Sequence, residues 1–193
     1  MAGVTDLMKP LDLFNDNLEV YEKDKENNKD HVATPRYVVE DIYSLINIKQ
    51  FKSVWLPFNN YDSEFKLRAE ELKLKYKASH IFNDLGEDFF ITDPPEECDL
   101  MISNPPFSLQ YEIIDRSFKL ALEGKIKSFA LLLPLSTLET EKRADLYQKH
   151  SDKLTVIIFK KRIKFIGKKT SFNTACCWIC YNIPGLINKL MWI

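Results

Sequence analysis

Apolar and polar positions divide most of the chain into short apolar runs that alternate with longer amphipathic segments. The short runs are bounded by prolines or polar residues, which is typical of buried strands. They predict strands over residues 53–57, 78–82, 99–103, 129–133, 156–159 and 174–182. The third of these strands leads directly into Asn104, Pro105 and Pro106, where it ends because proline has no N–H to donate to a sheet.

Between these runs, apolar residues recur at helical spacing. Thr34 followed by Pro35 predicts a helix start, because a hydroxyl can cap the first amides and proline suits the first turn. Ser63 can cap a second helix, and two further helices are expected over 109–122 and 139–149. The expected apolar faces of the first two helices are Val39, Ile42 and Ile46, and Phe65, Ala69, Leu72 and Tyr76. Strands that alternate with helices predict an α/β fold with a mostly parallel sheet, in which ligands bind at the carboxyl ends of the strands.

The two ends of the chain do not follow this alternation. Residues 1–30 contain a weakly amphipathic piece and then a polar run from Glu22 to Asp30, which indicates an arm and linker or a frayed terminus. Residues 31–185 are expected to form the folded domain. The tail over 186–193 is apolar, and we expect it to dock on the sheet or on a protein partner. We expect no separate target-recognition domain after it.

Composition and charge narrow the class of protein. With 193 residues, 45% of them hydrophobic, the chain is long enough for one domain with a substantial core. No signal peptide opens it and no apolar run approaches the roughly 20 residues of a membrane span, so we expect a soluble, cytoplasmic protein without a membrane partner. The net charge of −1 hides an asymmetry: the first thirty residues carry eight acidic side chains, whereas residues 160–169 carry six basic ones and no acid. That local basic field is sufficient to attract phosphates.

Four cysteines are present, three of them close together at Cys176, Cys177 and Cys180. A zinc site needs four ligands, usually in two separated pairs, and the sequence offers no second pair of Cys or His. Their apolar neighbours predict buried thiols in a strand. A metal site is the alternative, and we expect none.

The clearest chemical signal is the run from Cys98 to Phe107, an apolar strand followed by an amide, two prolines and an aromatic ring. The prolines stiffen the turn and remove two amide donors, so carbonyl oxygens can point outward. The Asn104 side-chain oxygen and the Pro105 carbonyl can then accept the two N–H groups of a substrate amino group, and Phe107 can stack on its base. The alternative is a turn that ends a strand and does no chemistry.

Asn104, Pro105, Pro106 and Phe107 resemble the catalytic motif Asn/Asp-Pro-Pro-Phe/Tyr of the amino-methyltransferase family that modifies adenine N6. The resemblance extends over about residues 31–183. It implies an S-adenosylmethionine-dependent methyltransferase fold, a mostly parallel seven-stranded sheet flanked by helices, with one strand more than the pattern places. It also implies methyl transfer from S-adenosylmethionine to adenine N6 in DNA, with RNA as the alternative partner, and no metal.

The resemblance assigns the methionine and loop parts of the cofactor site. Thr34 and Pro35 resemble the segment that lines the pocket for the methionine part, although a plain helix cap would look the same. Pro57 and Phe58 resemble the start of the family's glycine-rich loop, but no glycine follows them, so the close backbone approach that glycine permits is lost. The residues left as substitutes are Asn59, Asp62 and the helix start at Ser63.

The nucleoside part of the cofactor has its own candidates. Either His80 or Asp84 stands where the family has an acid that accepts from the ribose hydroxyls, and the sequence does not decide between them. Asp88 and Phe89 resemble the pair in which an aspartate accepts from the cofactor adenine and an aromatic ring packs on it. The alternative for both is simple core filling.

Two later segments resemble the parts of the family that meet the target base. Residues 131–135 resemble the strand and turn that flank the base pocket, although most of these leucines are expected to be core. Residues 160–169 resemble the region that meets the flipped base and its backbone, where cations bind phosphates and an aromatic ring can stack on a base. A solvated run of charge is the alternative. The expected nucleic-acid-binding residues are Lys160, Lys161, Arg162, Lys164, Phe165, Lys168 and Lys169.

Two functions are consistent with these features. The missing glycines favour a catalytically inactive methyltransferase-like protein that binds nucleic acid or a host partner, such as a phage or mobile-element product. The intact run from Asn104 to Phe107 favours the enzyme, because an active site under no selection should decay first. We therefore expect an adenine-N6 methyltransferase that flips its target base out of the stack.

Overall fold

The computed structural model describes residues 33–60, 62–80, 87–166, 174–186 and 189–193. Residues Ala33–Ile193 form one compact unit. The arm and linker expected over 1–30 lie outside the described residues, as do three expected site residues, Asp84, Lys168 and Lys169.

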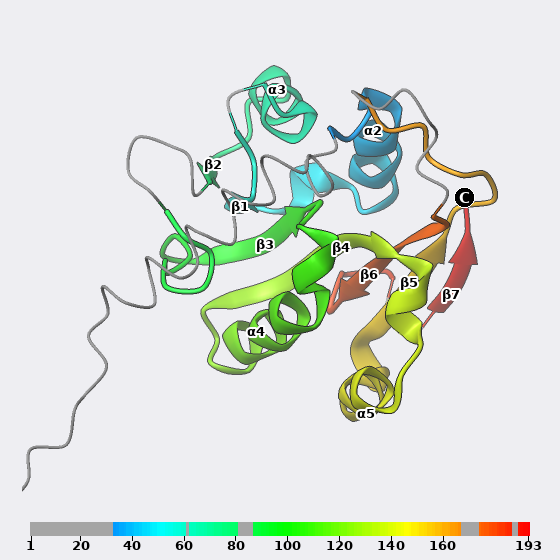
Figure 1. Cartoon of the computed structure of the whole chain (residues 1–193). Coiled ribbons are helices and arrows are strands. Elements are labelled where there is room, and N and C mark those ends of the chain that lie inside the picture. Colours follow the sequence, from blue (N-terminus) through cyan, green and yellow to red (C-terminus); the bar gives the residue numbers. More distant parts are fainter. Residues whose placement is uncertain (1–32, 61, 81–86, 167–173, 187–188) are drawn as a thin grey trace, which may run out of the picture. The chain divides into compact units, whose positions relative to one another are not determined.

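Within the described residues, seven strands form one sheet in the order β2-β1-β3-β4-β6-β5-β7 (Figure 1). The strands are β1 (Val54–Pro57), β2 (Tyr76–Ser79), β3 (Cys98–Ser103), β4 (Ile126–Pro134), β5 (Leu154–Ile158), β6 (Cys176–Tyr181) and β7 (Lys189–Trp192). β6 is antiparallel to both β4 and β5, and every other neighbouring pair is parallel. The expectation of a mostly parallel seven-stranded sheet is confirmed.

β7 is the strand that the sequence pattern does not place. The apolar tail, for which a site on the sheet and a site on a partner were both open, pairs with β5 from Thr155↔Lys189 to Ile158↔Trp192. It is an edge strand, and its Leu190 and Trp192 side chains are more than half exposed.

Helices cover both faces of the sheet (Figure 1). α2 (Arg36–Leu45) and α3 (Glu64–Glu71) lie on one face, and α4 (Gln110–Leu122) and α5 (Glu141–Lys149) lie on the other. Short 3₁₀ turns connect these elements: η1 (Ile48–Gln50), η2 (Phe107–Leu109), η3 (Leu135–Leu138) and η4 (Ser151–Lys153). Because both faces are covered, the central strand β4 has eight of its nine residues buried and reads as one continuous apolar run.

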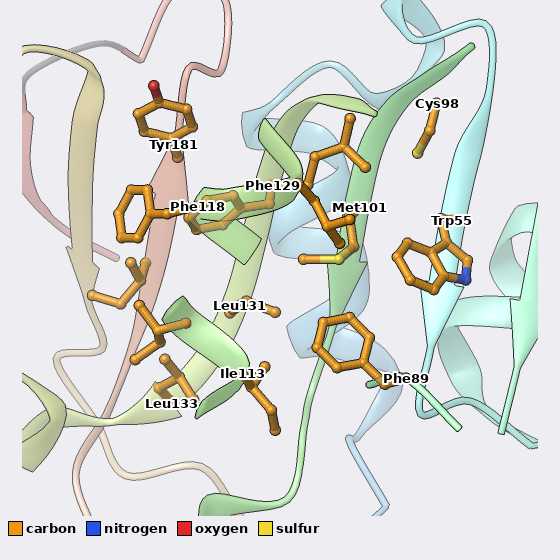
Figure 2. Close-up of a cluster of buried hydrophobic side chains, with 14 of the residues drawn as sticks. Trp55, Phe89, Cys98, Met101, Ile113, Phe118, Phe129, Leu131, Leu133 and Tyr181 are labelled. Atoms are coloured by element: carbon orange, nitrogen blue, oxygen red, sulfur yellow. The ribbon is translucent and has the colours of Figure 1, made fainter. Parts of the chain in front are cut away.

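The core on the α4–α5 face is built from alternate residues of the central strands, among them Met101, Phe129 and Leu131 (Figure 2). Phe118 of α4 meets the Phe129 ring edge-on, with 5.1 Å between ring centroids. Each such fully buried side chain stabilises the fold by roughly 1.5–3 kcal/mol. This packing fixes α4, and therefore the turn that precedes it, against the sheet.

Several element boundaries differ from expectation. α2 begins at Arg36, with Pro35 at the N-cap position and no side-chain cap, so the buried Thr34 does not cap the helix. Tyr76 belongs to β2 and not to the apolar face of α3, because the chain leaves the helix after Glu71 and Lys73 adopts a left-handed φ of 55°. The expected second strand is therefore shifted toward the amino end, and residues 81 and 82 lie outside the described part.

The cysteines behave as the sequence predicts. Cys98, Cys176, Cys177 and Cys180 are free and buried, three of them in β6. Burial raises the pKa of the Cys176 and Cys177 thiols to about 12, so they remain protonated and inert at neutral pH.

Among the described residues there is no cluster of three or more His, Cys, Asp or Glu side chains that could hold a metal ion, and no helix long and apolar enough to cross a membrane.

Candidate active site

The predicted site residues gather at one edge of the sheet. β1, β2, β3 and β4 run parallel, so Pro57, Ser79, Ser103 and Pro134, their last residues, lie along the same edge. Asn104 follows Ser103 directly, and its predicted position at the carboxyl end of a parallel strand is confirmed. This is the edge at which ligands bind in open α/β sheets.

Hydrogen bonds through Asn59 tie three of these strand ends together. Asn59, only 4% exposed, donates from Nδ2 to the Pro57 carbonyl at 2.7 Å and to Ser103 Oγ at 2.9 Å. Ser103 Oγ in turn donates to the Pro57 carbonyl, and Ser63 Oγ donates to Asn59 Oδ1. The backbone N–H of Asn59 binds the Ser79 carbonyl at 3.1 Å. Asn59 was expected to contact the cofactor, but its amide already bonds within the protein and holds the strand ends.

The loop after β1 makes its turn without glycine. Phe58 adopts a left-handed backbone with φ 62°, a conformation that glycine usually supplies and that costs other residues roughly 1–2 kcal/mol. Its half-buried ring packs on Phe89 with 4.8 Å between centroids. The contact between the two rings helps to hold the strained turn.

Phe89 and Asp88 are more deeply placed than the sequence suggested. Phe89 is 3% exposed and stacks on Trp55 at 5.5 Å, as the core-filling alternative predicts (Figure 2). Its contact with a cofactor stays a prediction. Asp88 is 3% exposed, and its Oδ1 accepts from the Phe90 N–H at 2.8 Å, which closes the local turn. Each residue sits inward because the chain turns tightly here, with the Asp88 carbonyl accepting from the Thr92 N–H at 2.8 Å.

Arg116 is a residue that sequence reasoning missed. It lies on α4, yet its Nε donates to the Phe89 carbonyl at 2.8 Å and its guanidinium lies 5.5 Å from the Phe89 ring centroid. Burial lowers the pKa of this guanidinium, which nevertheless stays charged. The helix after the Asn104 turn therefore holds the segment expected to bind the cofactor adenine.

The turn at Asn104 is well anchored on both sides. Ser103 is fully buried and Pro105 is buried, while Asn104 is half-buried with its Oδ1 shielded from solvent. Phe107 opens η2, where the Leu109 N–H binds the Pro106 carbonyl at 3.3 Å, and α4 follows at once. The turn thus joins the buried end of β3 to α4.

Residues 160–166, the cationic strap, cross this turn. Lys160, Lys161, Arg162 and Lys164 are exposed, as a nucleic-acid-binding surface requires. Phe165 was expected to stack on a base, but it is only 7% exposed and its ring meets Phe107 edge-on, at 6.4 Å between centroids. Burial alternates along the strap: Ile163 and Phe165 are buried, whereas Arg162, Lys164 and Ile166 are exposed.

The strap also reaches the expected methionine-binding segment. The Ile166 N–H donates to the Ala33 carbonyl at 3.0 Å, and the Lys164 N–H donates to the Tyr37 hydroxyl oxygen at 3.4 Å. Thr34, which is buried, and Pro35 lie between these contacts. The structure therefore brings together three predicted segments: the Thr-Pro segment, the Asn104 turn and the cationic strap.

Two buried acceptors at this edge were not predicted. Glu64 Oε2, in the first residue of α3, and Gln110 Oε1, in the first residue of α4, are shielded from solvent and accept no hydrogen bond in the described structure. Sequence patterns show which residue starts a helix, but not which polar atom turns inward. Of the remaining candidates, Asp62 is exposed and His80 is half-buried directly after β2.

Comparisons with known proteins agree with this architecture. No model of a known family and no curated protein matches the chain. Among solved structures, a protein assigned as the modification subunit of a type I restriction enzyme from Vibrio vulnificus YJ016 superposes with a TM-score of 0.55 at 14% identity, over 100% of this chain and 53% of that chain. The chain has an S-adenosylmethionine-dependent methyltransferase fold. It spans about half the length of the Vibrio subunit.

Two further solved structures with this methyltransferase fold are similar to the chain. One is assigned as a class I S-adenosylmethionine-dependent methyltransferase from Listeria monocytogenes (12% identity, TM-score 0.48, 85% of this chain and 67% of that chain). The other is the human methyltransferase 10 domain containing protein (11% identity, TM-score 0.45, 79% of this chain and 85% of that chain). The methyltransferase fold locates the ligand edge, and the chemistry has to be argued from the residues on it.

Proposed function

We propose that the chain transfers a methyl group from S-adenosylmethionine to the N6 amino group of adenine in DNA. One observation carries the proposal: the turn from Asn104 to Phe107 lies at the carboxyl end of β3, with the Asn104 Oδ1 shielded from water. Hydrogen bonds are stronger in such a site than in water, because no solvent competes for the acceptor.

The residues at this edge fit S-adenosylmethionine by the chemistry of their acceptors. Its ammonium group, ribose hydroxyls and adenine amino group all need hydrogen-bond acceptors. Glu64 Oε2, in the first residue of α3, is a buried acceptor that no donor satisfies in the described structure. Asp62 and His80 follow the ends of β1 and β2. Phe58, which directly follows β1, has a half-buried ring at the same edge. When bound, the cofactor supplies an electrophilic methyl group on a positively charged sulfur.

The chain's own contribution to the reaction is to hold the target amino group. The two N–H groups of the target adenine's amino group donate to Asn104 Oδ1 and to the Pro105 carbonyl. These bonds localise the nitrogen lone pair, which is otherwise delocalised into the purine. Phe107 stacks on the base, and Gln110 Oε1 gives the turn another buried acceptor. Holding the amino nitrogen in one orientation converts a loose encounter into an aligned attack. The base reaches this turn only after leaving the duplex stack.

The proposal is tested by titrating the full-length protein with S-adenosylmethionine and by following tritiated methyl transfer to adenine-containing duplex DNA. We expect saturable cofactor binding and label on adenine N6. Duplex in which adenine is replaced by 2-aminopurine, which lacks the N6 amino group, should stay unlabelled. Wild-type protein that neither binds the cofactor nor transfers methyl would contradict the proposal.

The Glu64 assignment has its own binding test. Glu64→Gln keeps the shape but removes the negative charge that an ammonium group requires, so affinity for S-adenosylhomocysteine should fall. Affinity for 5′-methylthioadenosine, which lacks the amino-acid part, should not change. An equal loss for both ligands would mean that Glu64 acts on the fold and not on the ammonium.

The DNA partner is supported by the exposed cations of the strap. Replacing Lys160, Lys161 and Lys164 by Gln should weaken binding of duplex DNA and reduce the slope of log K against log salt by about 3, roughly 0.9 for each lost phosphate contact. A control with Lys49, Lys52 and Lys73 changed to Gln, three exposed lysines outside the strap, should keep the wild-type slope. An unchanged slope in the strap variant would make these lysines a solvated surface.

One observation favours a second function. The loop after β1 has no glycine, and the Asn59 amide that could replace a glycine backbone bonds to Pro57, Ser103 and Ser63 instead. On that basis the chain would be a methyltransferase-like protein that binds nucleic acid or a partner without catalysis. This alternative predicts salt-dependent DNA binding together with no heat of S-adenosylmethionine binding.

A further inference from the structure

The cationic strap has two different sides. Its exposed side carries Lys160, Lys161, Arg162 and Lys164, and its buried side carries Ile163 and Phe165, which are 1% and 7% exposed. A run of charge that only needed solvation would have no reason to bury a phenylalanine between cations. The strap is therefore a bound segment of the fold and not a loose basic loop.

The buried side of the strap lies on the catalytic turn. The rings of Phe165 and Phe107 are 6.4 Å apart at an interplanar angle of 77°, the edge-to-face geometry that aromatic pairs prefer. Phe107 directly follows Pro106, so a ring that fixes Phe107 also restricts the residues that present Asn104. The Ile166 N–H bond to the Ala33 carbonyl and the Lys164 N–H bond to Tyr37 hold the strap on its other flank.

We infer that Phe165 is a positioning residue: its ring holds Phe107 and so couples the phosphate-binding strap to the catalytic turn. The inference rests on the proposed function in that the held turn is the one that receives the target amino group. A nucleic-acid backbone bound to the outward cations also clamps the strap, and the clamped strap presses Phe165 against Phe107. Phe165 consequently affects the rate of the chemical step, and the lysines affect DNA affinity and, through Phe165, that rate.

The contact is tested first without any need for activity, by amide hydrogen exchange in the full-length protein. Phe165→Leu removes the ring and should speed exchange over residues 107–110, with residues 113–118 in the middle of α4 unchanged. A short duplex DNA should slow exchange over 107–110 in the wild type and not in F165L. Phe165→Tyr keeps the ring and should behave as wild type, and Ile163→Val, a buried change on the same strap, is the matched control. Wild-type exchange over 107–110 in F165L would overturn the inference.

Kinetics supply the second measurement. F165L should reduce the single-turnover rate of methyl transfer by up to about 10²-fold, as small misplacements at a reacting centre do, with an unchanged Kd for duplex DNA. The triple lysine variant should raise Kd for duplex DNA, and the matched control Ile163→Val should keep both the wild-type rate and the wild-type Kd. A loss of DNA affinity without a loss of rate in F165L would overturn the positioning role and assign Phe165 to base contact.

The outcomes separate the inference from the proposed function. If wild-type protein transfers no methyl, the proposed function fails, and the exchange experiment alone still decides whether Phe165 holds the turn. If F165L does not fold, Phe165→Met, which is also ringless and of similar volume, takes its place in both measurements. Faster exchange throughout α4 in both variants would reduce Phe165 to a general packing residue and overturn the inference.

Discussion

The ends of β1 and β3 are neighbours at the same edge of the sheet, yet they are built in opposite ways. After β1 the chain turns at Phe58, which has a left-handed backbone, and the Asn59 side-chain amide bonds to the Pro57 carbonyl inside the turn. After β3 the chain turns through two prolines and keeps Asn104 and Phe107 at the edge. Two hydrogen bonds link the two ends: Asn59 Nδ2 donates to Ser103 Oγ at 2.9 Å, and Ser103 Oγ donates to the Pro57 carbonyl.

This contrast separates residues that stabilise the site's structure from residues that contact its ligand. Asn59 has each of its amide atoms bonded to the protein and is 4% exposed, so it acts as a framework residue. Asn104 lies one residue beyond the buried strand, where a ligand can reach its backbone neighbours. Two asparagines in almost equivalent positions should therefore respond differently to the same substitution.

The largest effect is expected at the catalytic turn. Asn104→Ala should lower methyl transfer by about 10²–10³-fold, by analogy with the loss of one aligned donor from an oxyanion hole, because the amino group loses one of its two acceptors. Cofactor binding and thermal stability should be largely retained. The measurement is tritiated methyl transfer to DNA, together with the shift of Tm in excess S-adenosylmethionine. A mutant that transfers methyl at the wild-type rate would remove Asn104 from the reaction.

The corresponding experiment at Asn59, the framework residue, tests stability instead of activity. Asn59→Ala removes one of two donors to the Pro57 carbonyl, which keeps its bond from Ser103 Oγ, and it removes the acceptor for Ser63 Oγ. Leaving one such partner unsatisfied costs about 1–3 kcal/mol. For a chain of this size each kcal/mol corresponds to roughly 2–4 °C in Tm, so a clear drop is expected in a thermal melt. Asn60→Ala, at the exposed neighbouring position, should stay within about 0.5 kcal/mol of wild type. Equal stability of N59A and N60A would contradict the framework role.

The sequence predicts elements best where burial is complete. The run that predicts a strand over 53–57 and the structure's β1 differ by one residue, because proline and polar residues bound a run that is buried on both faces. β2 is shifted because its residues are mostly half-buried, so Tyr76 and Lys77 give no continuous apolar run. β7 escapes prediction for the same reason, since Leu190 and Trp192 are exposed in an edge strand.

The site follows the same logic. Its position, at the end of the strand that leads into Asn104, is visible in sequence because prolines stop the strand there. The direction of single side chains is not visible: Phe89 and Phe165 turn inward, and Glu64 Oε2 is buried at a helix start. Those directions depend on backbone angles in turns, such as the left-handed φ of Phe58, which no hydrophobic period encodes.

A smaller effect is expected from that left-handed position. Phe58→Ala and Phe58→Gly both lose the ring contact with Phe89, but only glycine relieves the left-handed strain of roughly 1–2 kcal/mol. This gain exceeds the extra unfolded-state entropy of glycine, about 0.5–1 kcal/mol, so F58G should be up to about 1 kcal/mol more stable than F58A.

A control position should give the opposite order of stability for the glycine and alanine variants. At Leu67, on the exposed side of α3, glycine should be less stable than alanine by about 1 kcal/mol, because the residue is helical. The four variants are compared by urea unfolding, with ΔG taken at a common slope m. The same order at both positions, alanine above glycine, would show that the turn after β1 is not strained.

An effect of similar size is expected at the opposite end of β3, where Asp99 forms an ion pair and a backbone hydrogen bond. Asp99 Oδ1 accepts from Lys127 Nζ at 2.6 Å and Oδ2 accepts from the Lys52 N–H at 2.7 Å. Burial alone would raise the pKa of Asp99, but these hydrogen bonds outweigh it, so the pKa lies below its ordinary value. A depressed carboxyl pKa stabilises the fold above the unfolded-state pKa of about 3.9, and this contribution is lost as pH falls through the folded-state value.

Asp99→Asn tests that sign, because the amide can still accept from Lys52 but has no charge for Lys127. At pH 7 the variant should be less stable than wild type by up to about 1 kcal/mol, since the Lys127 side chain is largely exposed and water screens the pair. The difference should shrink as pH falls below about 4 and vanish once the Asp99 carboxyl is protonated in the folded protein. Urea unfolding of both proteins between pH 3 and pH 7 measures it. A difference that stays constant over this range would mean that Asp99 stabilises β3 by hydrogen bonding alone, and both ends of the strand would then depend on neutral bonds.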